Sequence, residues 1–304
     1  MYSLGSSKRH KKNYYYTDAE TTWKAPRFGN DSVRMHYDDI ARQEQGEKPD
    51  AAGIRLCNTL KSLLYACHRT IRPPPQKTLL IDLGSGKGGD IGKIARHFDR
   101  CVGVDISNHS LIEASKRATN TNLSFTPLLG DPAESSFPQS IGGADAVSSM
   151  FSLHYLVNTE PRARRLFSTL RLATRPGARF FGICVDWRSI QRGLGKEWCW
   201  FGDDISKEIC AKNAFSQVYK FVLEGSVDLE ETVVHMPTIE AIAEKEGWKL
   251  VLYENAKHYM ERNAGEFNAL ASKMGSLNDM KLGSHLLEIY SVFEWLRTQE
   301  PQKW

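Results

Sequence analysis

The chain has 304 residues, of which 41% are hydrophobic and 25% are charged, and its formal net charge is +4. This length and composition predict one large core, because single α/β domains often reach roughly 250 residues. No stretch approaches the roughly 20 consecutive apolar residues of a transmembrane helix, and the six cysteines are scattered without zinc-ligand spacing. We therefore expect no membrane partner, no metal site and reduced thiols.

Residues 1–30 form a basic segment without apolar periodicity, which we expect to be disordered. Lysines and an arginine at positions 8, 9, 11 and 12, with three consecutive tyrosines nearby, suit contact with RNA or a nuclear address. The mild net charge permits a polyanionic partner without requiring one. The alternative is a solvated tail with neither role.

Residues 31–304 are expected to form a single domain that begins with two helices between Ser32 and Ala66. Apolar residues recur there at helical intervals, with a break near Gly46 and Pro49. The second helix ends before the prolines at 73–75, because prolines in series cannot continue a helix.

From residue 78 onward the pattern alternates between short apolar strands and helices. The predicted strands are Thr78–Leu83, Cys101–Asp105, Leu123–Thr126, Ala144–Met150, Ala178–Val185, Lys249–Tyr253 and Leu286–Glu294. The predicted helices are Gly89–Phe98, Ser110–Ala118, Pro161–Thr174 and Pro237–Glu246. This order predicts an α/β fold: a doubly wound, mostly parallel seven-stranded sheet with helices on both faces and ligands at the carboxyl ends of the strands.

Two features of this pattern are open to more than one interpretation. The aromatic-rich residues from Asp186 to Leu229 break the rhythm, and we interpret residues 186–235 as an insertion that forms part of a substrate site. Its tryptophans could equally belong to the core. The arginines of the helix 161–174 are expected on its solvated face; they are Arg162, Arg164, Arg165 and Arg171.

A glycine-rich loop follows the first predicted strand and opens a helix. Gly84, Gly86 and Gly89 match the GxGxxG spacing that lets the backbone approach a nucleotide-like ligand. The loop is not a phosphate-binding P-loop, because Lys87 is followed by glycine rather than serine or threonine. Asp105, about 20 residues further on, stands where an acid binds ribose hydroxyls. The alternative is that the glycines only shape a tight turn.

The charge of this loop distinguishes between two nucleotide-like cofactors. Asp82 and Asp90 would repel the pyrophosphate of a dinucleotide, whereas the ammonium and sulfonium of S-adenosylmethionine are favoured beside acids. Asp131 falls just beyond the third strand, where it could reach the adenine or its surroundings. We therefore predict S-adenosylmethionine as the cofactor.

Several short motifs resemble those of the mRNA cap guanine-N7 methyltransferases, which are class I S-adenosylmethionine-dependent methyltransferases. Residues 82–90, DLGSGKGGD, resemble the family's DLGCGKGGD, and residues 58–62, NTLKS, resemble NWxKS. The lysine of the latter motif, here Lys61, holds the methionine carboxylate in the family. With the residues already named, the resemblance implies a cofactor-binding set of Lys61, Asp82, Gly84, Gly86, Asp90, Asp105, Asp131, Met150 and Phe151.

Other motifs resemble the family's cap-binding segments. His36-Tyr37 resembles the HYN-type segment, and Phe151 to Tyr155 resemble QFxxHY, with Met150 in place of the glutamine. Residues 225–234 resemble GxVDxPEYLV, whose glutamate, here Glu231, accepts hydrogen bonds from guanine N1 and N2. The resemblance implies catalytic roles for His154, Tyr155 and Glu231. The implied substrate-binding residues are Tyr37, His154, Tyr155, Glu231 and Tyr290, and Arg188, with Arg192 and Lys196, could meet the cap triphosphate.

The resemblance implies methyl transfer from S-adenosylmethionine to N7 of the mRNA cap guanine, with the capped 5′ end of RNA as substrate. Other capping enzymes or an activating subunit are possible partners, and the expected location is the nucleus, or the cytoplasm for a viral protein. Three alternatives stay open: another RNA position, a small-molecule acceptor, or a binding module without turnover. Without the resemblance, His154 and Tyr155 could be a core pair and Glu231 a solvated acid.

Overall fold

The computed structural model describes Met35 and residues 51–70, 72–73, 75–138, 140–192, 199–200, 211–215, 217–223, 227–279 and 287–298. The predicted basic tail and most of the first predicted helix lie outside these residues. Within the described ranges, no helix is long and apolar enough to cross a membrane.

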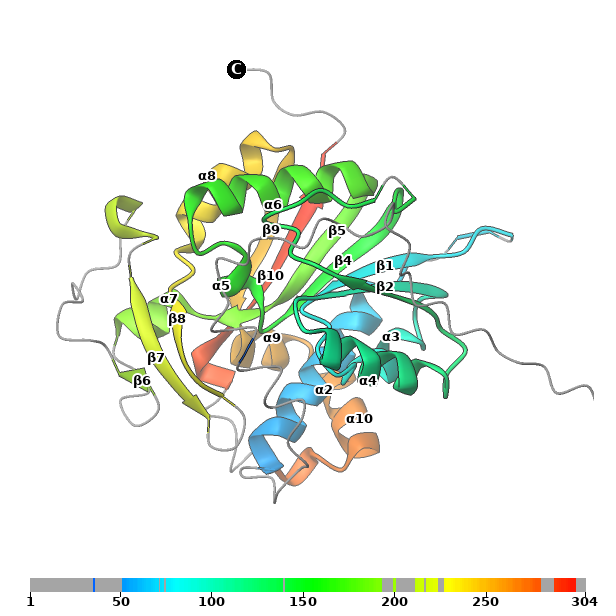
Figure 1. The fold of residues 1–304 in the computed structure, drawn as a ribbon. Helices are drawn as coiled ribbons and strands as arrows, with labels where there is room; N and C mark the ends of the chain where they lie inside the picture. Colours follow the sequence, from blue (N-terminus) through cyan, green and yellow to red (C-terminus); the bar gives the residue numbers. More distant parts are fainter. Residues whose placement is uncertain are drawn as a thin grey trace, which may run out of the picture.

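In this part of the chain, seven strands form one sheet in the order β3-β2-β1-β4-β5-β10-β9 (Figure 1). They are β1 (Leu79–Leu83), β2 (Arg100–Asp105), β3 (Ser124–Leu129), β4 (Ala144–Met150), β5 (Thr174–Val185), β9 (Trp248–Asn255) and β10 (Tyr290–Arg297). Strands β1 to β5 pair with one another in parallel, and β10 is antiparallel to both β5 and β9. The predicted doubly wound, mostly parallel sheet is confirmed.

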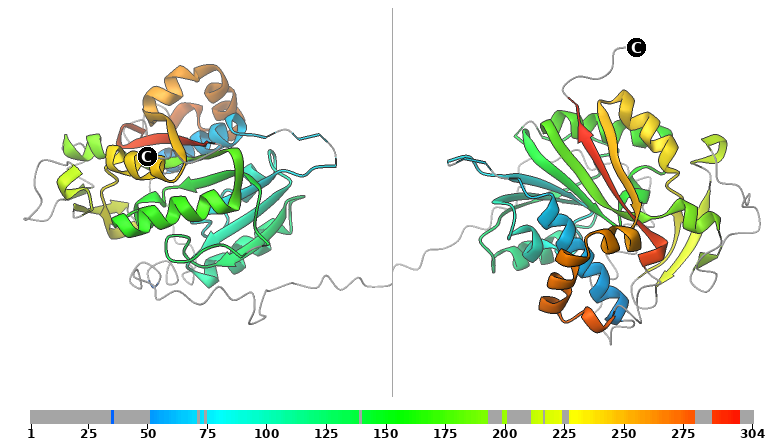
Figure 2. Two further views of the ribbon diagram at one scale, coloured as in Figure 1. Left: turned by 90° about the horizontal axis from the view of Figure 1, so that it is seen from above. Right: turned by 180° about the vertical axis from the view of Figure 1, so that it is seen from behind.

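Helices cover both faces of this sheet, as the two views of Figure 2 show. One face carries α2 (Ala51–Cys67), α3 (Ile91–Ile94), α4 (Asn108–Ala118), α9 (Ala256–Arg262) and α10 (Ala264–Met274); the other carries α6 (Glu160–Ala173) and α8 (Met236–Lys245). Neighbouring residues of one strand point to opposite faces. Leu80 accordingly packs in the core on the face that carries α2, and Ile81 packs in the core on the face that carries α6. Both faces of the inner strands are therefore buried, which is why these strands are apolar throughout.

Local signals place the helix ends that border the carboxyl edge of the sheet. The side chain of Ser107 accepts a hydrogen bond from the backbone N–H of Ser110 and caps α4. Thr159 caps α6 in the same way, and Pro161 occupies its first turn, where proline needs no hydrogen-bonded N–H. The helix α4 therefore begins soon after β2 ends, and α6 begins after the segment that follows β4.

Some predicted elements differ from the structure in length. The helix expected over Gly89–Phe98 is the short α3 followed by turns, and the strand expected over Leu286–Glu294 begins only at Tyr290 and runs to Arg297. Residues 287–289 are helical. Leu287 and Ile289 are nonetheless fully buried, and a short apolar run of this kind does not distinguish a strand from a buried helical turn.

The predicted insertion contains a second, three-stranded antiparallel sheet that the sequence analysis did not predict. Its strands are β6 (Cys199–Trp200), β7 (Val218–Leu223) and β8 (Val227–Thr232). The insertion also contains the short helix α7 (Trp187–Gln191). In Figure 1 this sheet stands beside α5 (Leu153–Leu156), the helical turn that follows β4, and α5 contacts β8. The small sheet therefore brings residues of the insertion to the carboxyl edge of the main sheet.

Candidate active site

A pocket opens at the point where the order of the parallel strands reverses, between β1 and β4. Doubly wound sheets bind ligands at such a switch point, outside the carboxyl ends of the strands. Its empty volume, including its opening to solvent, is about 840 Å³. It is lined by Gly84, Gly86, Val104, Asp105, Ile106, Ser110, Gly130, Asp131, Pro132, Met150, Phe151, Ser152, Tyr155 and Leu156.

Backbone conformation explains three of the glycines in the loop after β1. Gly84, Gly86 and Gly88 have φ values of 70°, 52° and 73°, which are in the left-handed region. A Cβ on Gly84 would lie 2.6 Å from Cβ of Ser152, and one on Gly88 would lie 2.8 Å from Cα of Ala114. Gly89, the third position of the expected GxGxxG pattern, lacks a positive φ, and a Cβ added there would meet nothing within 4 Å. The third required glycine is therefore Gly88.

Two acids of the pocket lie at the carboxyl ends of the second and third strands: Asp105 is the last residue of β2, and Asp131 follows β3 by two residues. The carboxylate of Asp105 accepts backbone hydrogen bonds from Gly86 and Ser107, each of 2.8 Å, and these fix it at the pocket wall. Asp131 also lines the pocket but is buried, and its Oδ2 accepts a 2.7 Å bond from Arg162. The expectation that Arg162 lies on a solvated helix face is wrong, since it is only 9% exposed.

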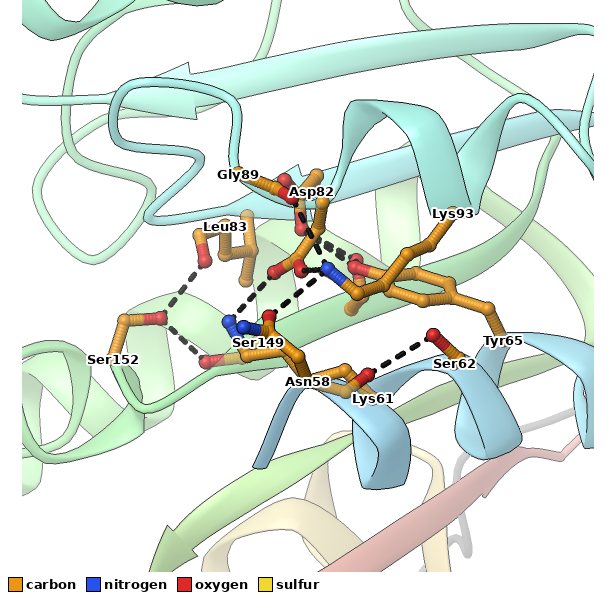
Figure 3. A network of polar contacts seen from close by, with 12 residues as sticks. Asn58, Lys61, Ser62, Tyr65, Asp82, Leu83, Gly89, Lys93, Ser149 and Ser152 are labelled. Carbon is orange, nitrogen blue, oxygen red and sulfur yellow. Dashed lines mark hydrogen bonds and ion pairs between the residues drawn. The ribbon is translucent and has the colours of Figure 1, made fainter. Parts of the chain in front are cut away.

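Asp82, at the end of β1, is buried in a polar network rather than in the lining of the pocket. Its Oδ1 accepts hydrogen bonds from Ser148, at 2.6 Å, and from Tyr65, at 3.5 Å (Figure 3). Burial, followed by the nearby charge of Asp90, raises the pKa of Asp82 to about 6. A cation close to this carboxylate would therefore be strongly favoured.

Lys61 and Lys93 enclose the third acid of this region, Asp90. Figure 3 shows the two lysines reaching toward each other from α2 and α3, and their Nζ atoms lie 2.9 and 2.8 Å from the Asp90 carboxylate. Burial acts to raise the pKa of Asp90, but the two ammonium groups outweigh it and lower that pKa. Lys61 also lies 5.2 Å from the centre of the Phe151 ring, which lines the pocket, so this network adjoins the pocket through Phe151.

A second buried cluster surrounds the carboxylate of Glu231 on β8, which is 4% exposed. Nε2 of His154 lies 3.3 Å from Oε1, the hydroxyl of Tyr155 donates to Oε1, and the hydroxyl of Tyr219 donates to Oε2. Burial acts to raise the pKa of Glu231, but His154 and the hydroxyls hold it below its ordinary value. Glu231 is thus an ionised, buried acid, not a solvated one.

This cluster borders the pocket, because Tyr155 lines the pocket and donates to Glu231. On the other side, Tyr290 packs edge-on against Phe151 with ring centroids 4.8 Å apart. Phe151 itself has a φ of 63°, unusual for a residue with a side chain and a mark of strained sites. Nδ1 of His154 is buried and has no hydrogen-bond partner among the described residues, so a ligand atom there would satisfy it.

Of the predicted substrate residues, Arg188 is not brought to this cluster. Tyr37 and Lys196 lie outside the described residues, and Arg188 forms a two-bond pair with buried Asp186, with distances of 2.9 and 3.0 Å. Arg188 is not part of the pocket lining. Asp186 also caps α7 by accepting from the Arg188 backbone, so this pair shapes the start of the insertion.

The structure adds residues that the sequence analysis did not assign to the site. Tyr219 lies in the aromatic-rich insertion, and it stands directly across from Glu231 in the β7-β8 pairing. Arg162, Lys93 and Tyr65 contact three of the four cofactor-side acids, which are Asp131, Asp90 and Asp82 respectively. Tyr219 could have been found from a hairpin register between residues 218–223 and 227–232; the other three have no local signal.

The pocket suits S-adenosylmethionine by the chemistry of its lining. Asp105 at the end of β2 can accept hydrogen bonds from ribose hydroxyls, and the apolar side chains of Ile106, Pro132 and Leu156 offer a surface for a flat base. The adjoining buried acid Asp82 favours an ammonium, and Lys61 favours a carboxylate. Among the described residues, no cluster of His, Cys, Asp and Glu could hold a metal ion.

Comparison with solved structures shows the class of the fold. The CcbJ methyltransferase from Streptomyces caelestis superposes with a TM-score of 0.52 at 16% identity, over 82% of this chain and 99% of that one. An S-adenosylmethionine-dependent methyltransferase from Clostridium acetobutylicum gives a TM-score of 0.51 at 11% identity, over 88% and 98%. The class I methyltransferase fold implied by the motifs is confirmed.

Sequence comparison identifies the family. An mRNA cap guanine-N(7) methyltransferase from Candida glabrata is 28% identical over 89% of this chain and 74% of its own length. The Saccharomyces cerevisiae enzyme of that name is 32% identical over 72% and 56%, and methyltransferase 1 of Arabidopsis thaliana is 29% identical over 86% and 77%. The family model of the mRNA (guanine-N(7))-methyltransferase domain matches residues 21–292, and the chain belongs to this family.

Proposed function

We propose that this chain transfers the methyl group of S-adenosylmethionine to N7 of the guanine that caps mRNA, converting GpppN to m7GpppN. The observation that carries this proposal is the buried carboxylate of Glu231, which lies beside the pocket at the strand switch point and whose pKa is held below its ordinary value by His154 and two hydroxyls. A buried carboxylate is costly unless it is paired, and here it keeps acceptor capacity for a base.

Glu231 is proposed to recognise the guanine. Guanine presents neighbouring donors at N1 and N2, which match the two oxygens of a carboxylate, whereas adenine presents an acceptor at N1. The hydroxyls of Tyr155 and Tyr219 hold that carboxylate in one orientation. Tyr290, packed on Phe151, is proposed to contact the purine ring from the other side.

The chemistry needs positioning and electrostatics rather than proton transfer. Guanine N7 already carries a lone pair, so no general base is required. S-adenosylmethionine supplies the methyl group, which is activated by the positive sulfonium. Glu231 favours the positive charge that develops on the purine, and the aromatic faces of Tyr155 and Tyr290 would each add about 1 kcal/mol by cation–π contact. His154, with its unpaired buried Nδ1, is proposed to orient the base.

The proposed cofactor contacts follow the chemistry of each residue. Asp105 would bind the ribose, and Gly84 and Gly86 would allow the cofactor to approach the backbone. Met150, Phe151 and Asp131 would border the rest of the molecule. Asp82 is proposed to attract the ammonium, while Lys61, held by Asp90, is proposed to pair with the carboxylate.

The proposal also covers the cap triphosphate, the extent of the domain, the location and the partners. The side chain of Arg188, 39% exposed, would share its charge between Asp186 and the cap triphosphate. Residues 31–304 are proposed to act as one domain with its substrate insertion at about 186–235. Nuclear location, and association with other capping enzymes or an activating subunit, fit the eukaryotic origin of the relatives and would be tested by imaging and affinity purification.

The test is transfer of radiolabel from S-adenosylmethionine to RNA capped with GpppA, with the m7GpppA cap as the matched acceptor. The proposal predicts label on the unmethylated cap only. Equal label on both caps would indicate another RNA position. Cofactor binding without label on either cap would favour a small-molecule acceptor, a missing subunit or a module without turnover, and would contradict the proposal for the isolated chain.

A further inference from the structure

One buried guanidinium joins the cofactor pocket to the guanine cluster. Arg162 lies in the first turn of α6, and its Nη2 donates to Asp131 Oδ2 at 2.7 Å and to the backbone carbonyl of Tyr155 at 2.9 Å. Its Nη1 donates to Glu134 Oε1. Asp131 belongs to the cofactor pocket, and Tyr155 donates to Glu231 in the guanine cluster. A single side chain therefore contacts both halves of the site.

The hydrogen bond from Arg162 to the carbonyl of Tyr155 fixes the position of α5. This carbonyl lies near the end of α5, a helix of only four residues, and the last carbonyls of a helix have no partner within the helix. The same short helix carries both His154 and Tyr155, the two α5 side chains beside Glu231. A shift of α5 would therefore move both of these contacts together.

The guanidinium is itself constrained. Its side chain is 10% exposed and is paired with two carboxylates, so moving it away would leave the buried carboxylate of Asp131 unpaired. The planar fork of arginine allows three acceptors to be held in fixed directions, which a lysine cannot reproduce. A displacement of Asp131 is therefore expected to reach α5 through Arg162.

We propose that Arg162 is a positioning residue that couples the two substrate sites, so that a cofactor bound beside Asp131 fixes α5 and strengthens binding of the cap guanine. This inference rests on the proposed function. By reciprocity, a bound cap strengthens cofactor binding by the same factor.

The helix offers a matched control. Arg164 lies two residues further along α6, is 41% exposed and pairs with Glu160 in the same helix. Exposed pairs of this kind contribute little to stability. Arg164→Gln changes the charge of α6 by the same amount as Arg162→Gln without touching the pocket or α5.

The measurement is the Kd of the cap analogue GpppG, determined by calorimetry with and without saturating S-adenosylhomocysteine. For the unsubstituted chain and Arg164→Gln, S-adenosylhomocysteine is expected to lower the Kd of GpppG about tenfold, a usual size for coupling between sites. For Arg162→Gln, the two Kd values should differ by less than about twofold. A purely structural defect would weaken the binding of both GpppG and S-adenosylhomocysteine. It would leave the ratio of the GpppG Kd values without and with S-adenosylhomocysteine as it is in the unsubstituted chain.

Two further measurements keep the test decisive. If Arg162→Gln does not fold, Asp131→Asn serves in its place. Asp131 contacts Arg162 and not the carboxylate of Glu231. Its substitution should nonetheless lower the ratio of the GpppG Kd values without and with S-adenosylhomocysteine. An unchanged ratio in these variants, with cap methylation intact in the unsubstituted chain, would overturn the inference alone. An unsubstituted chain that binds S-adenosylhomocysteine but neither binds nor methylates the cap would overturn the proposed function as well.

Discussion

Nε2 of His154 lies 3.3 Å from Oε1 of Glu231, and both side chains are at least 95% buried. One residue comes from the turn after β4 of the main sheet and the other from the small sheet of the insertion. A buried acid held by an imidazole and two hydroxyls is a costly arrangement for a protein without a ligand for it. Its place beside the pocket makes Glu231 the first residue to test.

Glu231→Gln is expected to lower kcat/KM for GpppA-capped RNA by about 100-fold, with little change in KM for S-adenosylmethionine. The substitution replaces one acceptor oxygen with a donor that opposes the guanine N–H groups, and it removes the charge that favours the methylated purine. Steady-state methyl transfer with each substrate varied provides the measurement. Glu254→Gln, at an acid of β9 that pairs with Arg262, is the control and should behave like the unsubstituted chain. A fall in cofactor affinity alone would argue against this assignment.

Tyr219→Phe should weaken cap recognition less than loss of the acid does, by about tenfold in KM for capped RNA. The phenol donates to Glu231 Oε2 from a side chain that is 1% exposed, and its removal leaves that oxygen with one hydrogen bond fewer. Combining both substitutions should add nothing to Glu231→Gln, because Tyr219 acts through that carboxylate. Additive losses in the double variant would show that Tyr219 has a separate role.

The pH dependence of stability should reveal Asp82. Its pKa is about 6 in the folded chain, above the ordinary value of 3.8, because of burial first and the neighbouring Asp90 second. Between these two values the folded state binds more protons than the unfolded state, so this group lowers stability as the pH rises from about 4 to 6. Above that window the cost is constant, about 2–3 kcal/mol for a shift of this size.

Asp82→Asn removes this cost, so the variant should gain stability relative to the unsubstituted chain as the pH rises, and the gain should level off above about pH 6. Urea unfolding at pH 4.5, 6 and 7.5 measures the difference, in which the other titrating groups cancel. A difference in unfolding free energy that does not vary with pH would contradict the raised pKa. Binding of S-adenosylhomocysteine should weaken in the same variant at pH 7.5, because the buried negative charge is lost.

Local patterns were sufficient to predict the main sheet and the region of the site. The strand-helix alternation from residue 78 onward determines which strands are parallel, and the loop at Gly84 and the acid at Asp105 follow the first two strands. Parallel strands place their carboxyl ends at one edge. The position of the pocket at the carboxyl edge of the sheet therefore follows from the order of these elements along the chain.

Contacts between segments far apart in the sequence could not be predicted in this way. The pairing of Tyr219 with Glu231 depends on the register of a hairpin whose strands were interpreted only as an aromatic-rich insertion. Arg162 has the surroundings of an exposed helical arginine in sequence, and only the position of Asp131 and α5 around α6 buries it. Helical periodicity describes one helix and carries no information on what covers its ends.

The correction at the glycine loop gives a sharp pair of variants, because Gly88 and Gly89 are adjacent. Gly88→Ala should lower the unfolding free energy by about 2–4 kcal/mol, since its φ of 73° is unfavourable for alanine and the new Cβ would lie 2.8 Å from Cα of Ala114. Gly89→Ala should change it by less than about 1 kcal/mol, because that position has ordinary φ and open space. Urea unfolding of both variants measures the difference. Equal losses of unfolding free energy would mean that the loop requires both glycines and that packing of α3 against α4 does not select Gly88. A larger loss for Gly88→Ala would identify Gly88 as the position where the loop turns back against α4.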